Sequence, residues 1–278
     1  MSTTPPETRP EHRGGGLPAF ARRYPQATFL IMILAVGWPS LVIPDLTGLS
    51  NIPFLLVVNF VGLFGSALLV TRWTAGPGAI RRLLAGTLRW RFGVGRYLVI
   101  LLGMPAVTIA VAASMGTLNI PDDWAGAALS YALSTVVLGT LILNLWEETA
   151  WTGFLQARLM ERHGLLTGAL LTAPWFVAVH LPLSFAPGWT WSNAALNLGI
   201  LVLAAPFIRY LLGAHYLATG GSLLAVGLQH AAFNASAGFG LAGWEYIVAM
   251  VILTLLVALH RTLTRARPTR PVRDPIVA

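Results

Sequence analysis

Two adjacent carboxylates, Glu147 and Glu148, lie in the middle of an apolar stretch, LNLWEETAWTGFLQARL, that covers residues 143–159. A charged side chain at the centre of a bilayer costs about 3 kcal/mol on insertion scales, so two such groups side by side require a chemical reason. Apart from Glu245, every other acidic residue falls in a tail or a short connection. Successive residues of a helix point about 100° apart, and the two carboxylates are therefore expected to have different roles.

Three further polar residues, His180, His230 and Asn234, also lie inside apolar segments. His230 and Asn234 are spaced i, i+4 and share one helix face. With a rise of about 1.5 Å per residue, Glu147, His180 and His230 each lie about 15 to 24 Å from one end of their own helix. We therefore expect these three side chains to meet near mid-depth and to face one cavity.

By residue type, this set could perform several kinds of chemistry. A carboxylate and an imidazole can activate water for hydrolysis, and buried carboxylates and histidines can also relay protons. Glu147, His180 and His230 could instead hold zinc, because three nitrogen or oxygen ligands plus water form a catalytic zinc pattern. A lone intramembrane histidine is often only an interhelical hydrogen-bonding group, but the number of polar groups here makes that interpretation weaker.

Other protease chemistries lack their residues in this chain. The sequence has no cysteine, which excludes disulfides and thiol catalysis. It contains neither Gly-x-Ser-x-Gly for a serine nucleophile nor His-Glu-x-x-His for a zinc site on one helix. No pair of aspartates lies in an apolar segment, which excludes an aspartyl mechanism.

The composition is that of an integral membrane protein. Of the 278 residues, 56% are hydrophobic and only 10% are charged, whereas a soluble domain carries about 25% charged residues. The net charge of +8 comes from arginine alone, and the arginines occupy the tails and connections. That placement fits the excess of basic residues in cytoplasmic loops better than it fits a nucleic-acid partner. We therefore predict an all-α, polytopic protein that contacts the lipid bilayer and no nucleic acid.

About eight transmembrane helices are expected, because a helix needs about 20 apolar residues to cross the hydrocarbon core. The predicted spans cover residues 27–46, 52–71, 97–115, 125–160, 164–182, 193–212, 222–238 and 243–261. The span 125–160 would be on the order of 50 Å long, so it must be tilted, kinked or extended beyond the membrane. The basic stretch 72–96 is predicted to be either an amphipathic helix in the interface or a plain basic loop.

The chain divides into one membrane domain and two tails. Residues 1–25 are predicted to be a disordered cytoplasmic tail, 26–262 the transmembrane domain, and 263–278 a basic cytoplasmic tail. With eight spans both termini lie on one side, and the arginine-bearing segments all fall on that side, which predicts cytoplasmic termini. The absence of lysine indicates a GC-rich bacterial genome, so the expected location is the plasma membrane of a bacterium.

Three motifs in the second half of the chain resemble the CPBP family of intramembrane endopeptidases. This family includes the type II CAAX prenyl proteases and is also called the Abi or CAAX protease family. The motifs are Glu147-Glu148-x-x-x-x-Gly153-Phe154-Leu155, then Phe176-x-x-x-His180, then His230-x-x-x-Asn234. They stand in the family's order, each on a separate predicted membrane helix, and the resemblance covers about 125–260.

The resemblance implies a catalytic set made of Glu147, Glu148, His180, His230 and Asn234. Glu147 would hold and deprotonate a water molecule with assistance from His180. His230 and Asn234 would donate hydrogen bonds to the tetrahedral oxyanion, and Glu148 would be a supporting acid. This mechanism requires no cofactor, and the zinc site described above is the alternative.

One position departs from the family pattern. The family's first motif has an arginine at the fourth residue after the glutamate pair, where this chain has Thr152. That arginine would be spaced i, i+4 from Glu148 and placed to pair with it. Without it, Glu148 is expected to be protonated, to pair with Asn144, or to be held by an arginine from elsewhere in the chain.

The expected function is cleavage of a membrane-embedded or lipidated peptide or protein by an intramembrane endopeptidase. Two alternatives stay open. A non-enzymatic membrane protein, for immunity or scaffolding, would keep the fold and use the glutamates only in helix packing. A proton-coupled transporter would use them as a relay, although no inverted repeat of the kind found in transporters is visible. The sequence gives no indication of the oligomeric state.

Overall fold

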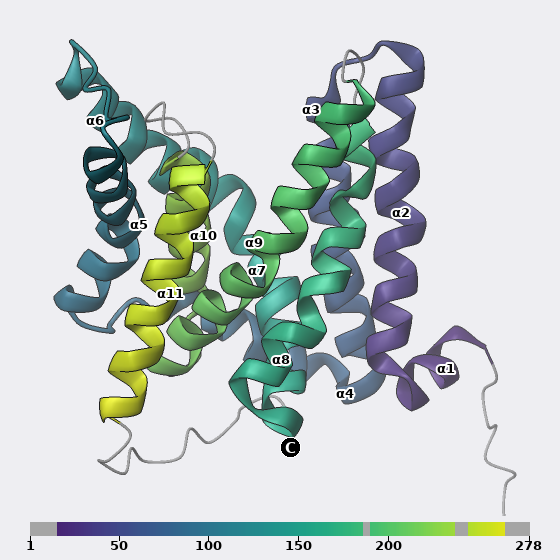
Figure 1. Ribbon diagram of the computed structural model, residues 1–278. Coiled ribbons are helices and arrows are strands. Elements are labelled where there is room, and N and C mark those ends of the chain that lie inside the picture. Colours follow the sequence, from purple (N-terminus) through teal and green to yellow (C-terminus); the bar gives the residue numbers. More distant parts are fainter. Residues whose placement is uncertain (1–15, 186–189, 237–243, 265–278) are drawn as a thin grey trace, which may run out of the picture.

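Every regular element in the described part of the chain is helical (Figure 1). The computed structural model describes residues 16–185, 190–236 and 244–264. Within these ranges the prediction of an all-α fold is confirmed. The ends of both predicted tails, 1–15 and 265–278, lie outside the described residues.

The helices follow one another with short connections. In chain order they are α1 (Leu17–Arg23), α2 (Pro25–Thr47), α3 (Asn51–Val57), η1 (Val58–Gly65), α4 (Ser66–Ala85), η2 (Gly86–Leu88), α5 (Val94–Met115), α6 (Trp124–Leu133), η3 (Ser134–Asn144), α7 (Leu145–Glu148), η4 (Thr149–Gln156), α8 (Ala157–His180), η5 (Leu181–Phe185), α9 (Trp191–Ala218), α10 (Leu223–Ser236) and α11 (Trp244–Thr264). Helix α1 falls within the predicted disordered tail. Pro18 stands in its first turn, where proline favours a helix start, and Ala21 is buried.

Six helices in the described ranges are long and apolar enough to cross a membrane, namely 25–47, 51–88, 94–115, 124–185, 191–218 and 245–264. The fourth of these contains two predicted spans, because helical geometry is interrupted at Gly164, whose φ of +80° suits glycine. Helix α10, which corresponds to another predicted span, has 14 residues and is shorter than a full crossing. The chain is therefore a multi-pass membrane protein, while the count of eight and the cytoplasmic termini stay predictions.

The basic stretch 72–96 is mostly helical. Helix α4 is interrupted at Gly76, where φ is +75°, and then continues into the short 3-10 turn η2. In this part Leu83 is buried whereas Arg81 is exposed. Burial on one side agrees with the amphipathic-helix alternative as far as η2, and residues 89–93 have non-helical backbone.

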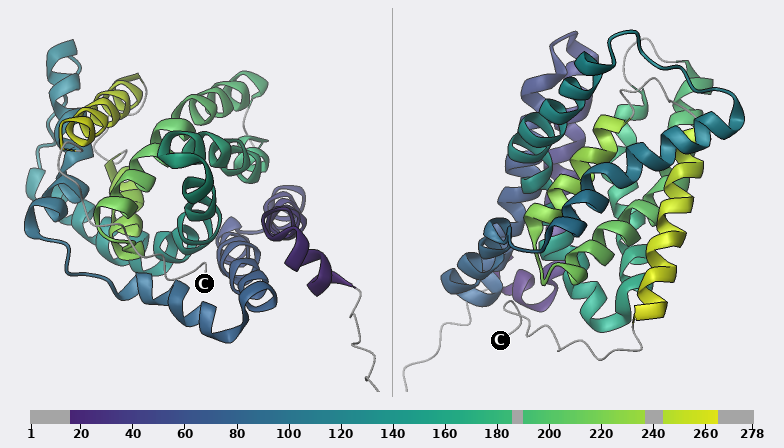
Figure 2. Two further views of the ribbon diagram at one scale, coloured as in Figure 1. Left: turned by 90° about the horizontal axis from the view of Figure 1, so that it is seen from below. Right: turned by 90° about the vertical axis from the view of Figure 1, so that its left-hand side faces the viewer.

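One long helical run, from Trp124 to the break at Gly164, crosses the bundle obliquely and carries the glutamate pair (Figures 1 and 2). It contains two π-helical segments, η3 and η4, which flank the single turn α7 that holds Glu147 and Glu148. A π-helical turn is wider than an α-helical turn and is frequent at functional sites. The excess length expected for this span is therefore accommodated by its oblique course.

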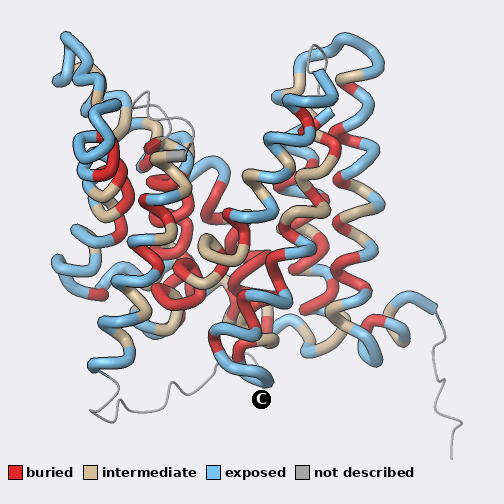
Figure 3. Tube along the Cα trace, viewed as in Figure 1, coloured by how far each residue is buried: buried red, intermediate tan, exposed pale blue. Residues whose placement is uncertain are grey.

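Aromatic side chains pack around the turn that holds the glutamates. Trp151 and Phe154 are fully buried, and their ring centroids lie 6.0 and 4.9 Å from that of Phe29 in α2. Trp151 also contacts Phe176 of α8 at 5.8 Å. Buried residues concentrate on the inward faces of the helices, whereas the outer faces expose many large apolar side chains, as contact with lipid requires (Figure 3). These aromatic contacts hold η4, the segment directly after the glutamate pair, against α2 and α8.

Helix α10 approaches the glutamate-bearing turn through a glycine. A Cβ atom added at Gly227 would lie 3.0 Å from Cα and 3.1 Å from the backbone nitrogen of Leu145. We expect Gly227→Val to lower the free energy of unfolding by about 1–3 kcal/mol, because the two backbones would have to separate. Equilibrium unfolding in detergent measures this loss. Gly199→Val is the control, since a Cβ at Gly199 meets no heavy atom within 4 Å; equal losses in both variants would contradict the packing argument.

Candidate active site

Glu147 and Glu148 lie in different environments although they are adjacent in sequence. Glu147 is half-buried and lines a cavity of about 170 Å³. Glu148 has no exposed surface and is held by three side chains of other residues. The rotation of about 100° between successive helical residues accounts for this divergence.

The cavity beside Glu147, called the glutamate cavity below, collects polar side chains from separate helices. Its polar lining comes from Asn59, Asn144, Glu147, His180 and Asn234, and its apolar lining from Leu41, Leu55, Val58, Leu63, Leu143, Val179 and Leu183. Three of the five predicted site residues, Glu147, His180 and Asn234, thus surround one space. His230 and Glu148 do not line it.

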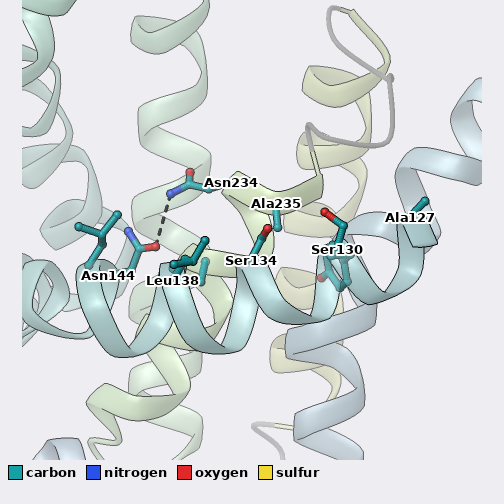
Figure 4. A pocket seen from close by; sticks show the side chains of 11 residues that line it. Ala127, Ser130, Ser134, Leu138, Asn144, Asn234 and Ala235 are labelled. Carbon is teal, nitrogen blue, oxygen red and sulfur yellow. Dashed lines mark hydrogen bonds between the residues drawn. The ribbon is translucent and has the colours of Figure 1, made fainter. Parts of the chain in front are cut away.

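Asn144 positions the Glu147 carboxylate. Its Nδ2 donates to Oε2 of Glu147 at 3.1 Å, from one turn earlier in the same helical run. Its Oδ1 in turn accepts a long hydrogen bond, 3.5 Å, from Nδ2 of Asn234 in α10 (Figure 4). The sequence analysis considered Asn144 only as a partner of Glu148, so its role beside Glu147 was missed. Its i, i+3 spacing from Glu147 was the available signal.

The imidazole of His180 is oriented by its own helix. Nδ1 lies 2.7 Å from the carbonyl oxygen of Phe176, and the two rings are 4.5 Å apart. Because a carbonyl oxygen can only accept, Nδ1 carries the proton, and Nε2 is the unprotonated nitrogen of the neutral ring. His180 therefore combines a fixed tautomer with a place in the lining of the glutamate cavity.

Glu148 forms a buried ion pair with Arg209 of α9. The guanidinium donates from Nη1 to Oε1 at 3.1 Å and from Nη2 to Oε2 at 2.7 Å, and neither side chain has exposed surface. Thr152 donates to the same carboxylate and accepts from Nη2 of Arg209 at 2.6 Å. Of the three states expected for Glu148, the structure has the third, an arginine from elsewhere in the chain.

Arg209 is itself enclosed by α8 and η4. Its Nε donates to Oε1 of Gln156 at 2.9 Å, and Nε2 of Gln156 donates to the Arg209 carbonyl at 2.7 Å. Its guanidinium carbon lies 5.4 Å from the ring centroid of Phe176, within cation–π range. The arginines were expected in the tails and connections, but Arg209 lies inside the predicted span 193–212 and its side chain is 0% exposed. The signal was its position inside an apolar run, where an arginine needs a buried partner.

His230 contacts Glu148 rather than the glutamate cavity. Its Nδ1 lies 2.8 Å from Oε1 of Glu148, so the carboxylate orients this ring as the Phe176 carbonyl orients His180. No group of three or more His, Cys, Asp or Glu in the described ranges could hold a metal ion. The predicted zinc ligands, Glu147, His180 and His230, therefore do not fit a zinc site in this geometry.

A second cavity, of about 390 Å³ and called the serine cavity below, adjoins the first. It is lined by Ala127, Ser130, Tyr131, Ser134, Leu138, Gly139, Leu143, Asn144, Ala231, Asn234 and Ala235. Leu143, Asn144 and Asn234 line both cavities. Figure 4 shows Ser130, Ser134 and Asn144 along the long helix, with Asn234 and Ala235 of α10 opposite them.

Most of the residues that line the two cavities lie in a segment that matches a known family. Residues 129–236 match the family model described as type II CAAX prenyl endopeptidase Rce1-like. Over this segment the chain is similar to the CAAX protease family. The match confirms the resemblance read from the three motifs, and it contains Glu147, Glu148, His180, His230 and Asn234. A search of curated proteins gave no match.

The similarity to the CAAX protease family relates Thr152 to Arg209. The family pattern has its arginine at position 152, and in this chain the guanidinium reaches the same carboxylate from α9, with the Thr152 hydroxyl between them. The positive charge beside Glu148 is therefore retained although the local motif lacks it.

Proposed function

We propose that this chain is an intramembrane endopeptidase that hydrolyses peptide bonds with a water molecule activated by Glu147. The observation that carries the proposal is the glutamate cavity, in which Glu147, His180 and Asn234 from three helices line one space. The Rce1-like match over 129–236 supports the protease class.

In the proposed reaction Glu147 takes a proton from water while the water oxygen bonds to the carbonyl carbon of the substrate. Asn144 occupies one carboxylate oxygen of Glu147, which leaves the other oxygen for the water. His180 assists through Nε2, the nitrogen that accepts a hydrogen bond. The proton held by Glu147 then passes to the amide nitrogen of the substrate as the carbon–nitrogen bond breaks.

Two groups are proposed to stabilise the oxyanion that forms on the substrate. Asn234 donates through Nδ2, whose present bond to Asn144 is long at 3.5 Å and is readily exchanged for a charged acceptor. His230 donates through Nε2 in its doubly protonated form, in which Nδ1 donates to the Glu148 carboxylate. Arg209 and Glu148 act through His230 and are positioning residues in this scheme.

No cofactor enters this mechanism, since water activation needs only the carboxylate and the neutral imidazole. The proposed substrate is a membrane-embedded or lipidated peptide or protein, and the proposed location is a bacterial plasma membrane. Because Arg209 pairs with Glu148, the presence of Thr152 in place of the family arginine does not favour a non-enzymatic scaffold. The transporter alternative gains no support from a separate observation.

The direct test is cleavage by the purified protein in detergent. We expect incubation with a mixed peptide library to yield new termini in mass spectrometry, and the yield to be unchanged by a zinc chelator. Products that disappear with chelator and return with zinc would contradict the metal-free mechanism. A library that stays intact at every protein concentration, and again when whole membrane extracts supply the substrates, would contradict the protease.

Asn234→Ala is expected to lower kcat about 10²–10³-fold with little change in KM, because an oxyanion donor acts mainly in the transition state. Initial rates on a peptide identified in the library assay measure both constants. Asn119→Ala, at an exposed asparagine before α6, is the control and should leave both unchanged. A rise in KM without a fall in kcat would show that Asn234 binds substrate and does not stabilise the oxyanion.

A further inference from the structure

Charge is distributed unequally between the two ends of the helix bundle. At one end, the described connections 48–50, 116–123 and 181–185 contain no arginine, whereas acidic residues occur at or near this end at Asp45, Asp122, Asp123 and Glu245. Exposed or half-buried arginines instead mark the opposite helix ends, at Arg22, Arg23, Arg72, Arg81, Arg82, Arg89, Arg91, Arg96, Arg158, Arg162 and Arg261. In Figure 1 the labels α1, α4 and α8 lie at this arginine-rich lower end, and α3 and α6 lie at the upper end.

Both cavities lie nearer to the arginine-free end. In the glutamate cavity, Leu41 is about 24 Å along α2 from Pro25 but only about 9 Å from Thr47. In the same cavity, His180 lies at the end of α8 that leads to the arginine-free connection 181–185. Asn234, which lines both cavities, stands in the last turn of α10. Helices α2, α8 and α10 therefore all place the cavities toward the arginine-free end.

The serine cavity continues toward that end along α6. Its outermost lining residues, Ala127 and Ser130, lie in the first two turns after Asp123, the residue that caps α6 through a hydrogen bond to the nitrogen of Gly126. Ser130 is exposed, and Ser134 is half-buried. The exposure of these serines decreases in the direction of the glutamates, as expected of an access route.

The arginine-rich side of a multi-pass protein is the cytoplasmic side. We infer that the catalytic cavity is entered from the extracytoplasmic side, through the serine cavity, and that its substrate is an extended polypeptide segment presented at that face of the membrane. The statement about the substrate rests on the proposed function, whereas the direction of entry into the cavity does not depend on catalysis.

The lining of the serine cavity suits a peptide backbone. Small residues, Gly139, Ala231 and Ala235, leave room beside the hydroxyls of Ser130 and Ser134. A volume of about 390 Å³ lies within the usual range of ligand pockets, roughly 300–1,000 Å³. Hydroxyls can donate to and accept from backbone amides, whereas a cavity for a long lipid chain would have few polar groups.

Cysteine labelling tests the direction of entry, because the chain has no native cysteine. Ser134→Cys would report on the cavity, Asn119→Cys on the arginine-free end and Glu161→Cys on the arginine-rich end; residues 119 and 161 are exposed. Each variant is treated with a membrane-impermeant charged maleimide in intact cells and again after permeabilisation. We expect Ser134→Cys and Asn119→Cys to be labelled in intact cells, and Glu161→Cys only after permeabilisation.

Two results would overturn the inference. Labelling of Ser134→Cys only after permeabilisation, together with labelling of Glu161→Cys in intact cells, would place the entrance in the cytoplasm. Absence of labelling at Ser134→Cys under both conditions, in protein that elutes as the parent does in size exclusion, would show that water does not reach the cavity. Neither result depends on turnover, so a failure of the proposed protease activity remains distinguishable.

Discussion

Glu147→Gln is expected to lower kcat for peptide cleavage by about 10²–10⁴-fold, the usual contribution of a general base. The glutamine carbonyl can still accept the hydrogen bond that Asn144 donates, so the side chain should keep its place in the glutamate cavity. What is lost is the ability to take a proton from water. Initial rates on a peptide from the library assay, at saturating concentration, measure the effect.

The control for this prediction is Glu161→Gln, which makes the same chemical change at an exposed position close to the break at Gly164. We expect it to cleave at the parent rate and the two variants to unfold at similar temperatures. A Glu147→Gln protein that retains more than a tenth of the parent rate would show that Glu147 is not the general base.

Arg209→Met is expected to lower the free energy of unfolding by about 3–5 kcal/mol, because it leaves Glu148 as a buried carboxylate without its cation. Methionine fills a similar volume, so the loss reports on charge and hydrogen bonding more than on packing. Denaturant unfolding in detergent gives the value. Arg209→Lys should recover only part of it, since an ammonium cannot make the paired contacts of the guanidinium to both carboxylate oxygens.

Second substitutions decide whether the ion pair is the cause. Adding Glu148→Gln to Arg209→Met should restore most of the lost stability, because no unpaired charge then remains. Adding Thr152→Arg to Arg209→Met should restore stability and part of the activity, since position 152 is where the family pattern carries its arginine. If Arg209→Met is as stable as the parent, or if neither second substitution helps, Arg209 does not replace the family arginine.

The sequence was sufficient for features that depend on local spacing. The separation of Glu147 from Glu148 follows from the rotation of about 100° per residue. The excess length of the span 125–160 predicted a tilt, a kink or an extension beyond the membrane, and Figure 2 shows an oblique course. The meeting of Glu147 and His180 also followed, because helical rise fixes depth along each helix.

Other features depend on contacts between distant parts of the chain and could not be derived from spacing. Arg209 and Glu148 are 61 residues apart in the sequence, and their pairing depends on which face of α9 points toward Glu148. The same holds for His230, whose shared helix face with Asn234 suggested a common cavity. In the structure, Nδ1 of His230 contacts Glu148 instead. His230 and Asn234 lie on the same side of α10, but their side chains point in different directions. The π-helical segments η3 and η4 also left no pattern in the residue types.

The ion pair between Glu148 and Arg209 has a consequence for how such sequences change over time. One buried carboxylate can take its cation from position 152 or from position 209, but a chain with neither would carry an unpaired buried charge. The two positions are therefore expected to vary together among relatives, with arginine at one when it is absent from the other. A lineage that moves the arginine from position 152 to position 209 must pass through a form that has both arginines, or through one that has first lost the glutamate at position 148. Relatives that lack the arginine of the local motif should thus be examined at the position of Arg209 before they are taken as inactive.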